Sequence, residues 1–231
     1  MKKFFLLGML CIMILTAVSC ANELRTSEDY LSMYDAWLAE NQEWVTLYPF
    51  EENGLWGYMD ESGDVIIQPQ FRMARSFSEG LAFVTIGEHT IEQRGYIDVT
   101  GEIVIPRPMI GYWDGEFSDG FAHVIERAYE RNENRRAIGP LGPYIFIDRT
   151  GQNIFGQEFA GVRPFREGFA RVIPLRGNPF FIDRTGAHAF DGMEFRLISS
   201  DFKDGYANVI LLDGTAAYID RLGNIERGWR D

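Results

Sequence analysis

The chain has 231 residues, of which 46% are hydrophobic and 14% aromatic, so it carries enough apolar material for a packed core and is not disordered as a whole. Its 22 basic and 34 acidic residues give a formal net charge of −12. Nucleic-acid-binding proteins need a basic surface that displaces phosphate counterions, so this charge argues against a nucleic-acid partner. Two cysteines are too few for a disulfide framework or a cysteine-based zinc site, and we expect neither a metal nor a cofactor.

Residues 1–19 have the pattern of a signal peptide. Two lysines precede an apolar run from Phe4 to Val18, which is shorter than the ~20 residues of a membrane-spanning helix. The run ends in Ala17-Val18-Ser19-Cys20, which resembles the lipobox of bacterial lipoproteins. The resemblance implies cleavage before Cys20, a lipid anchor on that cysteine, and an extracytoplasmic location in the cell envelope, at the outer membrane or the cell surface. An ordinary secretory signal that contains a cysteine is the alternative.

Residues 20–53 are predicted to be a lipidated tether followed by one helix. Hydroxyl and acidic residues at 26–29 suit a helix N-terminus. Apolar residues then recur at helical spacing, which predicts a helix from about Ser27 to Asn41 that caps the end of the following domain. A helix that binds a partner is the alternative. The apolar residues of the predicted face are Tyr30, Leu31, Tyr34, Trp37 and Leu38.

Residues 54–231 contain two signatures that recur in register, as four full copies and a partial fifth. The first is aromatic-aliphatic-Asp-x-x-Gly, and the second is Phe-x-acid-Gly-apolar-Ala-x-Val. The Asp and Gly residues of the first signature are Asp60 and Gly63, Asp98 and Gly101, Asp148 and Gly151, Asp183 and Gly186, and Asp220 and Gly223. The glycines of the second signature are Gly80, Gly120, Gly168 and Gly205.

Both signatures predict turns between short strands. In Asp-x-x-Gly the carboxylate accepts from backbone amides of the turn, and glycine permits a positive φ. β-Branched runs such as residues 65–67 follow, so each copy is expected to form about three antiparallel strands. Alternation in the second signature predicts buried Ala and Val, with the intervening residues toward solvent. Those intervening residues are Phe83, His123, Arg171 and Asn208.

The expected fold class is therefore all-β, a tandem array of β-hairpin or three-strand repeats with one short N-terminal helix. Because one copy cannot bury its own apolar face, the copies must stack or arrange radially. A closed, propeller-like arrangement usually has four strands per blade, so the predicted strand number favours an open, solenoid-like or partly curled array.

The run from Leu55 to Phe71, followed by Phe77-Ser78-Glu79-Gly80-Leu81-Ala82, resembles the bacterial WG (KWG) repeat. The resemblance covers about residues 54–225, although only the first copy has the Trp56-Gly57 pair. It implies an all-β array used for interaction rather than for a reaction. We therefore expect a non-catalytic binding platform for protein or glycan partners.

The acidic residues leave alternatives open. The five repeated aspartates are expected to form turns, because they lack the additional carboxylates of a calcium loop. The acidic residues that directly precede the glycine of the second signature form either an acidic ridge across the array or a solvated turn edge. Three scattered histidines, His89, His123 and His188, lack metal-ligand spacing. No catalytic motif is present, but carboxylate pairs of an envelope polysaccharide hydrolase meet only in space, so that function remains an alternative. A purely structural spacer is the third hypothesis.

An insertion at residues 126–143 interrupts the repeats. Arg127, Arg131 and Arg135 are four residues apart, so a helical turn would place them on one face. Insertions in repeat arrays map to loops and often bind ligands. We therefore identify these arginines, together with the nearby unmatched Trp113, as candidate binding residues. A solvated loop of mixed charge is the alternative.

Overall fold

The computed structural model describes residues 44–87, 93–107, 115–125 and 143–229, and the backbone of 130–131 and 137–138. The signal peptide, Cys20 and the helix predicted from Ser27 to Asn41 lie outside the described residues. Within them the protein is all-β, with no α-helix and no closed barrel, so the fold class expected for the repeats is confirmed there. A single 3-10 turn, η1 (Phe190–Gly192), is present in the same ranges.

The first two sheets are antiparallel meanders. The first has three strands in the order β1-β2-β3, and the second has four in the order β4-β5-β6-β7. β1 precedes residue 54, so the first sheet includes residues that the sequence analysis assigned to the tether. The strands are β1 (Tyr48–Glu52), β2 (Leu55–Met59), β3 (Val65–Phe71), β4 (Met73–Ala74), β5 (Ala82–Ile86), β6 (Gln93–Ile97) and β7 (Ile103–Pro106).

The second half of the chain forms a five-stranded sheet, β14-β13-β12-β11-β8, and a four-stranded sheet, β15-β16-β17-β18. All their strand pairs are antiparallel. The strands are β8 (Ala122–Ile125), β11 (Tyr144–Ile147), β12 (Phe159–Val162), β13 (Phe169–Pro174), β14 (Phe180–Asp183), β15 (Leu197–Ile198), β16 (Tyr206–Ile210), β17 (Ala216–Asp220) and β18 (Ile225–Arg227).

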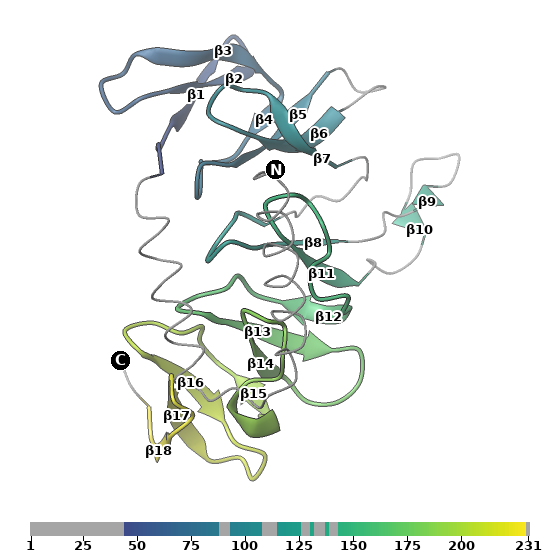
Figure 1. Ribbon diagram of the computed structural model, residues 1–231, viewed down its shortest axis with the longest axis vertical. Coiled ribbons are helices and arrows are strands. Elements are labelled where there is room, and N and C mark those ends of the chain that lie inside the picture. The colour runs from purple at the N-terminus through teal and green to yellow at the C-terminus, as the bar shows by residue number, and fades with distance from the viewer. Residues whose placement is uncertain are drawn as a thin grey trace, which may run out of the picture.

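The sheets follow one another along the long axis of the molecule (Figure 1). The sheet of β1–β3 lies at one end of this axis and the sheet of β15–β18 at the other. Because the first and last sheets do not meet, the described repeats form an open array.

Each internal sheet is shared between consecutive sequence copies, two in the sheet of β4–β7 and three in the five-stranded sheet. β5 carries the Ala and Val of one copy, whereas its neighbour β6 carries the Tyr96-Ile97-Asp98 signature of the next, with Ala82 opposite Ile97. The backbone hydrogen bonds of the sheet therefore join consecutive copies. The expected three strands per copy are found among the described residues of the second copy (β6, β7 and β8), the third (β11, β12 and β13) and the fourth (β14, β15 and β16). The first copy has a fourth strand, β4, which is two residues long and too short to show an alternating pattern.

The Ala and Val residues of the second signature are buried as expected, but none of the intervening residues is fully exposed. Phe83 is only 3% exposed and packs with Tyr96 of its own sheet and with Phe117 and Val124 of the next copy. His123, Arg171 and Asn208 are half-buried. The expectation was wrong because stacked sheets cover both faces of an internal strand, whereas strict alternation assumes that one face meets water.

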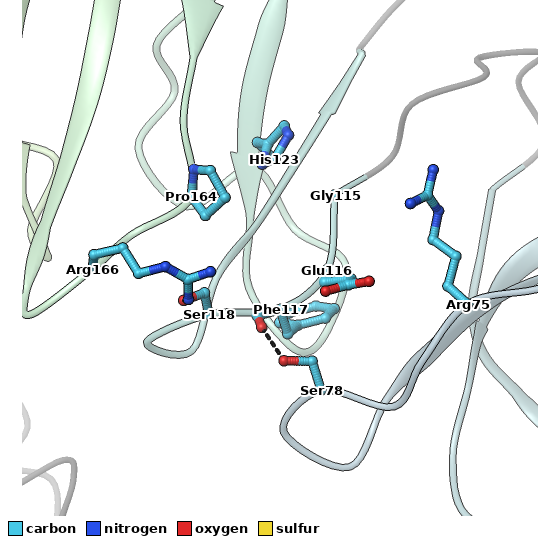
Figure 2. Close-up of a pocket in the computed structure, with 9 residues that line it drawn as sticks. All are labelled: Arg75, Ser78, Gly115, Glu116, Phe117, Ser118, His123, Pro164 and Arg166. Atoms are coloured by element: carbon cyan, nitrogen blue, oxygen red, sulfur yellow. Dashed lines mark hydrogen bonds between the residues drawn. The ribbon is translucent and has the colours of Figure 1, made fainter. Parts of the chain in front are cut away.

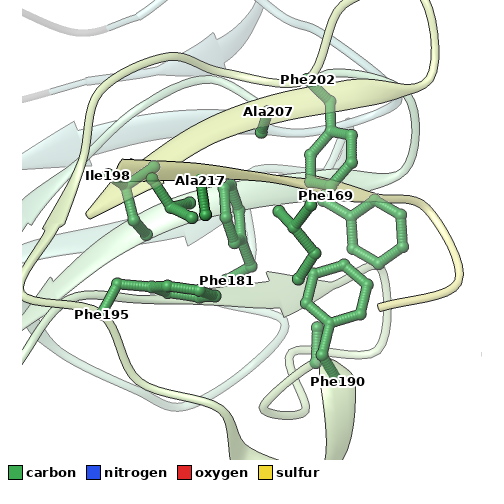
Figure 3. Packing of buried hydrophobic residues seen from close by; sticks show 11 residues of the cluster. Phe169, Phe181, Phe190, Phe195, Ile198, Phe202, Ala207 and Ala217 are labelled. Carbon is green, nitrogen blue, oxygen red and sulfur yellow. The ribbon is translucent and has the colours of Figure 1, made fainter. Parts of the chain in front are cut away.

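The apolar contacts between sheets are rich in aromatic residues. Figure 3 shows the cluster between the last two sheets, in which Phe169 and Phe181 meet Phe202, Ala207 and Ala217. The rings of Phe181 and Phe202 have centroids 5.1 Å apart in an edge-to-face arrangement. Such pairs contribute about 1 kcal/mol beyond the burial of their area. The array is thus held together by a core that runs between sheets.

The insertion contains a short hairpin where the structure describes it. β9 (Glu130–Arg131) pairs antiparallel with β10 (Ala137–Ile138). Arg131 therefore lies in a short strand, and not in the helical turn that would place the three arginines on one face.

Candidate functional site

The five repeated aspartates form turns with their own backbone. The Oδ1 of Asp148 accepts hydrogen bonds from the amides of Thr150 and Gln152 and from the Thr150 hydroxyl. Burial acts to raise the pKa of Asp148, but these hydrogen bonds outweigh it and lower that pKa. The equivalent aspartates accept comparable turn hydrogen bonds. The glycines that follow, Gly63, Gly101, Gly151, Gly186 and Gly223, all have positive φ.

The second signature forms two-residue hairpin turns. In the first copy the amide of Ser78 donates to the carbonyl of Leu81, and the amide of Leu81 donates to the carbonyl of Ser78. Both central residues, Glu79 and Gly80, have positive φ, which is the mark of a type I′ turn. The other three copies, centred on Asp119-Gly120, Glu167-Gly168 and Asp204-Gly205, have the same hydrogen bonds and the same signs of φ.

The acids of these turns connect consecutive copies in a ladder. The Gly120 amide donates to Oε2 of Glu79 at 3.0 Å, and the Gly168 amide donates to Oδ2 of Asp119 at 2.8 Å. The Gly205 amide likewise donates to Oε2 of Glu167 at 2.9 Å. These three acids are therefore neither an acidic ridge nor a solvated edge, since each is hydrogen-bonded to the next copy.

A pocket of about 270 Å³, called the first pocket below, lies beside this ladder (Figure 2). Three successive copies contribute to its wall. The Ser78 hydroxyl donates to the carbonyl of Phe117 at 2.6 Å, and Nη1 of Arg166 donates to Oγ of Ser118 at 2.6 Å. The side chains used in the argument below are Arg75, Ser78, Glu116, Ser118, His123 and Arg166.

A second pocket of about 460 Å³ lies between the third and fourth copies. Arg166 also lines this pocket, so the two pockets are neighbours, and together they are called the inter-repeat groove below. The rest of the second pocket is lined by the aromatic Tyr206, the polar Ser200 and Asn208, and the charged Asp201 and Lys203. Asp201 forms an ion pair with Arg171, with Nε and Oδ1 3.4 Å apart.

His123 is neutral at physiological pH. Its burial, together with the nearby charges of Arg163 and Arg75, lowers its pKa to about 4. Its Nδ1 is buried and has no hydrogen-bond partner in the described part of the chain. His188 packs instead against the ring of Phe180, and burial lowers its pKa. His89 lies outside the described residues.

The described residues contain no cluster of His, Cys, Asp and Glu with the geometry of a metal site. Among the same residues, no helix has the length and apolar character needed to cross a bilayer.

The binding residues predicted in and near the insertion lie mostly outside the described part of the chain, so the structure does not test them as a site. Trp113, Arg127 and Arg135 lie outside the described residues, and only the backbone of Arg131 is described, in β9. Sequence reasoning missed Arg75, Arg166 and Lys203. An alignment of the four copies contained a signal for two of these residues, because the position after the Phe of the second signature changes from Ser78 and Ser118 to Arg166 and Lys203.

Two segments of the chain, residues 56–88 and 146–173, match the family described as WG containing repeat. The first segment begins in the sheet of β1–β3 and continues into β5 of the next sheet, whereas the second begins in β11 and ends in β13 of the five-stranded sheet. The chain therefore carries WG-type β repeats, and this part of the resemblance is confirmed.

No curated protein matches the chain. Among solved structures, it is similar to the computationally designed Ika8 protein, with 15% sequence identity and a TM-score of 0.37. The similarity covers 80% of this chain and 62% of the designed chain.

Proposed function

We propose that this protein is a lipid-anchored, non-catalytic component of the bacterial cell envelope that binds a protein or glycan partner through its WG-type repeats. The anchor is the lipid predicted on Cys20, and the inter-repeat groove is the binding face. The observation that carries the binding role is that equivalent residues of the second and fourth copies line the two pockets, and that Arg166 of the third copy lines both.

A repeated groove suits a ligand that is itself extended. The first pocket uses residues of three copies, so a ligand in it contacts several repeats at once. The walls are also held firmly, because the ladder from Glu79 to Gly120 and the Ser78 and Ser118 hydroxyls fix each turn against the next. A pre-formed site loses little conformational entropy on binding, and this favours affinity.

Lys203 provides a direct test, because it is the only lysine after Lys3 and lines the second pocket. The full chain in mild detergent is screened against envelope extracts and a glycan array, and each binder is then tested for protection of Lys203 from amine acylation, followed by mass spectrometry. We expect a bound partner to reduce acylation of Lys203 at least fivefold. Screens without any binder, or binders that leave Lys203 unprotected, would contradict this function.

The same screen separates the two alternatives. New reducing ends released from a bound polysaccharide would indicate a hydrolase instead, and a spacer would bind nothing. The anchor is tested separately by mass spectrometry of the mature N-terminus, where a Cys20→Ser variant is expected to lose both the acyl mass and the membrane fraction.

A further inference from the structure

The first pocket is positively charged within an acidic protein. Among the described residues that line it, Arg75 and Arg166 are the cations and Glu116 is the one carboxylate. Arg163, which is exposed, adds a further positive charge close to His123. Because the whole chain has a net charge of −12, attraction of an anion here must come from these local residues.

Two polar groups at this pocket are left without partners. Nε of Arg75 and Nδ1 of His123 are both buried without a hydrogen-bond partner in the described part of the chain. Buried polar atoms of folded proteins are normally hydrogen-bonded, so these two atoms beside one pocket are available to contact a polar ligand. A guanidinium group pairs best with a planar or tetrahedral oxyanion.

The groove offers side chains rather than a free strand edge. At Ser78, Ser118 and Lys203 the backbone amide and carbonyl are both used inside the type I′ turns. An extended peptide that adds to a sheet needs such backbone groups to be unpaired. A glycan is recognised through side-chain hydrogen bonds and aromatic faces, and the second pocket supplies these in Asn208 and Tyr206.

We propose that the first pocket binds one anionic group of an acidic glycan, with Arg75 and Arg166 contacting the oxyanion, while the second pocket holds the neighbouring uncharged sugar. This inference rests on the proposed function, since it identifies the chemistry of the ligand in the same groove. A carboxylate, a sulfate or a phosphate group meets the requirement equally, because each presents at least two oxygens to the arginines.

The test compares charged polysaccharides with uncharged counterparts of the same backbone. The full chain in mild detergent is titrated with polygalacturonate and its fully methyl-esterified form, dextran sulfate and dextran, and phosphomannan and mannan. We expect at least one charged polymer to bind ten times more tightly than its counterpart, and the pair that does so identifies the anionic group. Equal binding of charged and uncharged forms overturns the inference but leaves the proposed function intact. Failure of all three charged polymers to bind also overturns it.

Variants locate the binding. Arg75→Gln and Arg166→Gln are each expected to weaken binding of the preferred charged polymer about tenfold, and to leave its uncharged counterpart unaffected. Arg176→Gln removes the same charge from an exposed loop outside both pockets and should leave binding unchanged. Thermal unfolding verifies that each variant is folded, and Arg75→Lys should retain part of the affinity. An unchanged affinity in both glutamine variants would contradict the assignment.

Discussion

At the scale of single residues, Asp119 shows how a short polar side chain joins two copies. Asp119 is 8% exposed and its carboxylate accepts from the Gly168 amide, whereas the equivalent Asp204 is exposed, and the second signature does not recur in residues 206–231. Asp119→Ala should therefore lower the free energy of unfolding by about 2 kcal/mol more than Asp204→Ala. Because both residues have φ near +53°, the backbone cost of alanine cancels in the comparison.

Urea unfolding of the two variants measures this difference. Equal losses of stability would show that the ladder contributes nothing beyond the geometry of the turn.

His123 makes stability depend on pH. Its pKa is about 4 in the folded state and about 6.5 when unfolded, so the unfolded chain binds more protons between these values. Stability contributed by neutral His123 is present above pH 6.5 and is lost as the pH falls toward 4. His123→Asn, which introduces the residue found at the equivalent position 208, should reduce the loss on acidification by about 2 to 3 kcal/mol.

Unfolding at pH 7.5 and 4.5 measures the difference between the native chain and this variant. Other groups such as Glu79 titrate in both proteins and cancel. A variant with the same loss of stability as the native chain would contradict the prediction.

At the scale of elements, the Asp-x-x-Gly turns act as contact points between sheets. A Cβ on Gly151 would lie 2.7 Å from Cγ2 of Ile105, which belongs to the preceding sheet. Gly63 has nearly the same φ, but a Cβ there would meet no described atom within 4 Å. Positive φ alone costs an alanine about 1 kcal/mol, and forced displacement of a packed side chain costs about 2 kcal/mol more.

We therefore expect Gly63→Ala to lower stability by about 1 kcal/mol and Gly151→Ala by about 3 kcal/mol. Thermal and urea unfolding of the two variants provide the measurement. If Gly63→Ala is as damaging as Gly151→Ala, the backbone conformation is the cause and the contact between sheets is not.

At the scale of the whole molecule, the two ends of the array are closed by different means. At the first hairpin turn, Trp44 lies on Gly80, and the guanidinium of Arg149 stacks 4.1 Å from the centre of the Trp44 ring. In the earlier copies, the residue four positions after the Asp-x-x-Gly glycine packs beside the corresponding glycine of the next copy; these residues are Ile67, Ile105, Phe155 and Phe190. At the other end of the described array, the residue at this position is Arg227. A terminal repeat needs a polar outer face, and an exposed arginine supplies it.

Arg227→Phe should therefore increase self-association, because it gives the last sheet the apolar residue that internal sheets use to bind their neighbours. Sedimentation velocity at several concentrations is expected to show a larger average mass for this variant than for the native chain. Arg227→Glu, which keeps the end polar, serves as the control. An unchanged mass for Arg227→Phe would show that the end is closed by other residues.

The turns and the repeat were readable in the sequence because they are local. Asp148 and Gly151 are three residues apart, and the carboxylate and the positive φ that they supply act within the same turn. The partners of Glu79, by contrast, belong to another copy, 41 residues further along the chain. The candidate groove could not be predicted for the same reason, since Arg75 and Arg166 are 91 residues apart and line one pocket only when three copies stack.

The sequence by itself therefore determined the repeating all-β chain, the positions of its turns and the buried Ala and Val rows, because hydrogen bonding within a turn and alternation along a strand are properties of neighbouring residues. Only the tertiary structure decided that sheets are shared between copies, that Phe83 and His123 face the next copy rather than water, and that arginines of separate copies line one pocket. The physical reason is that a stacked array buries both faces of its internal sheets, so contacts between copies determine burial and charge in the groove.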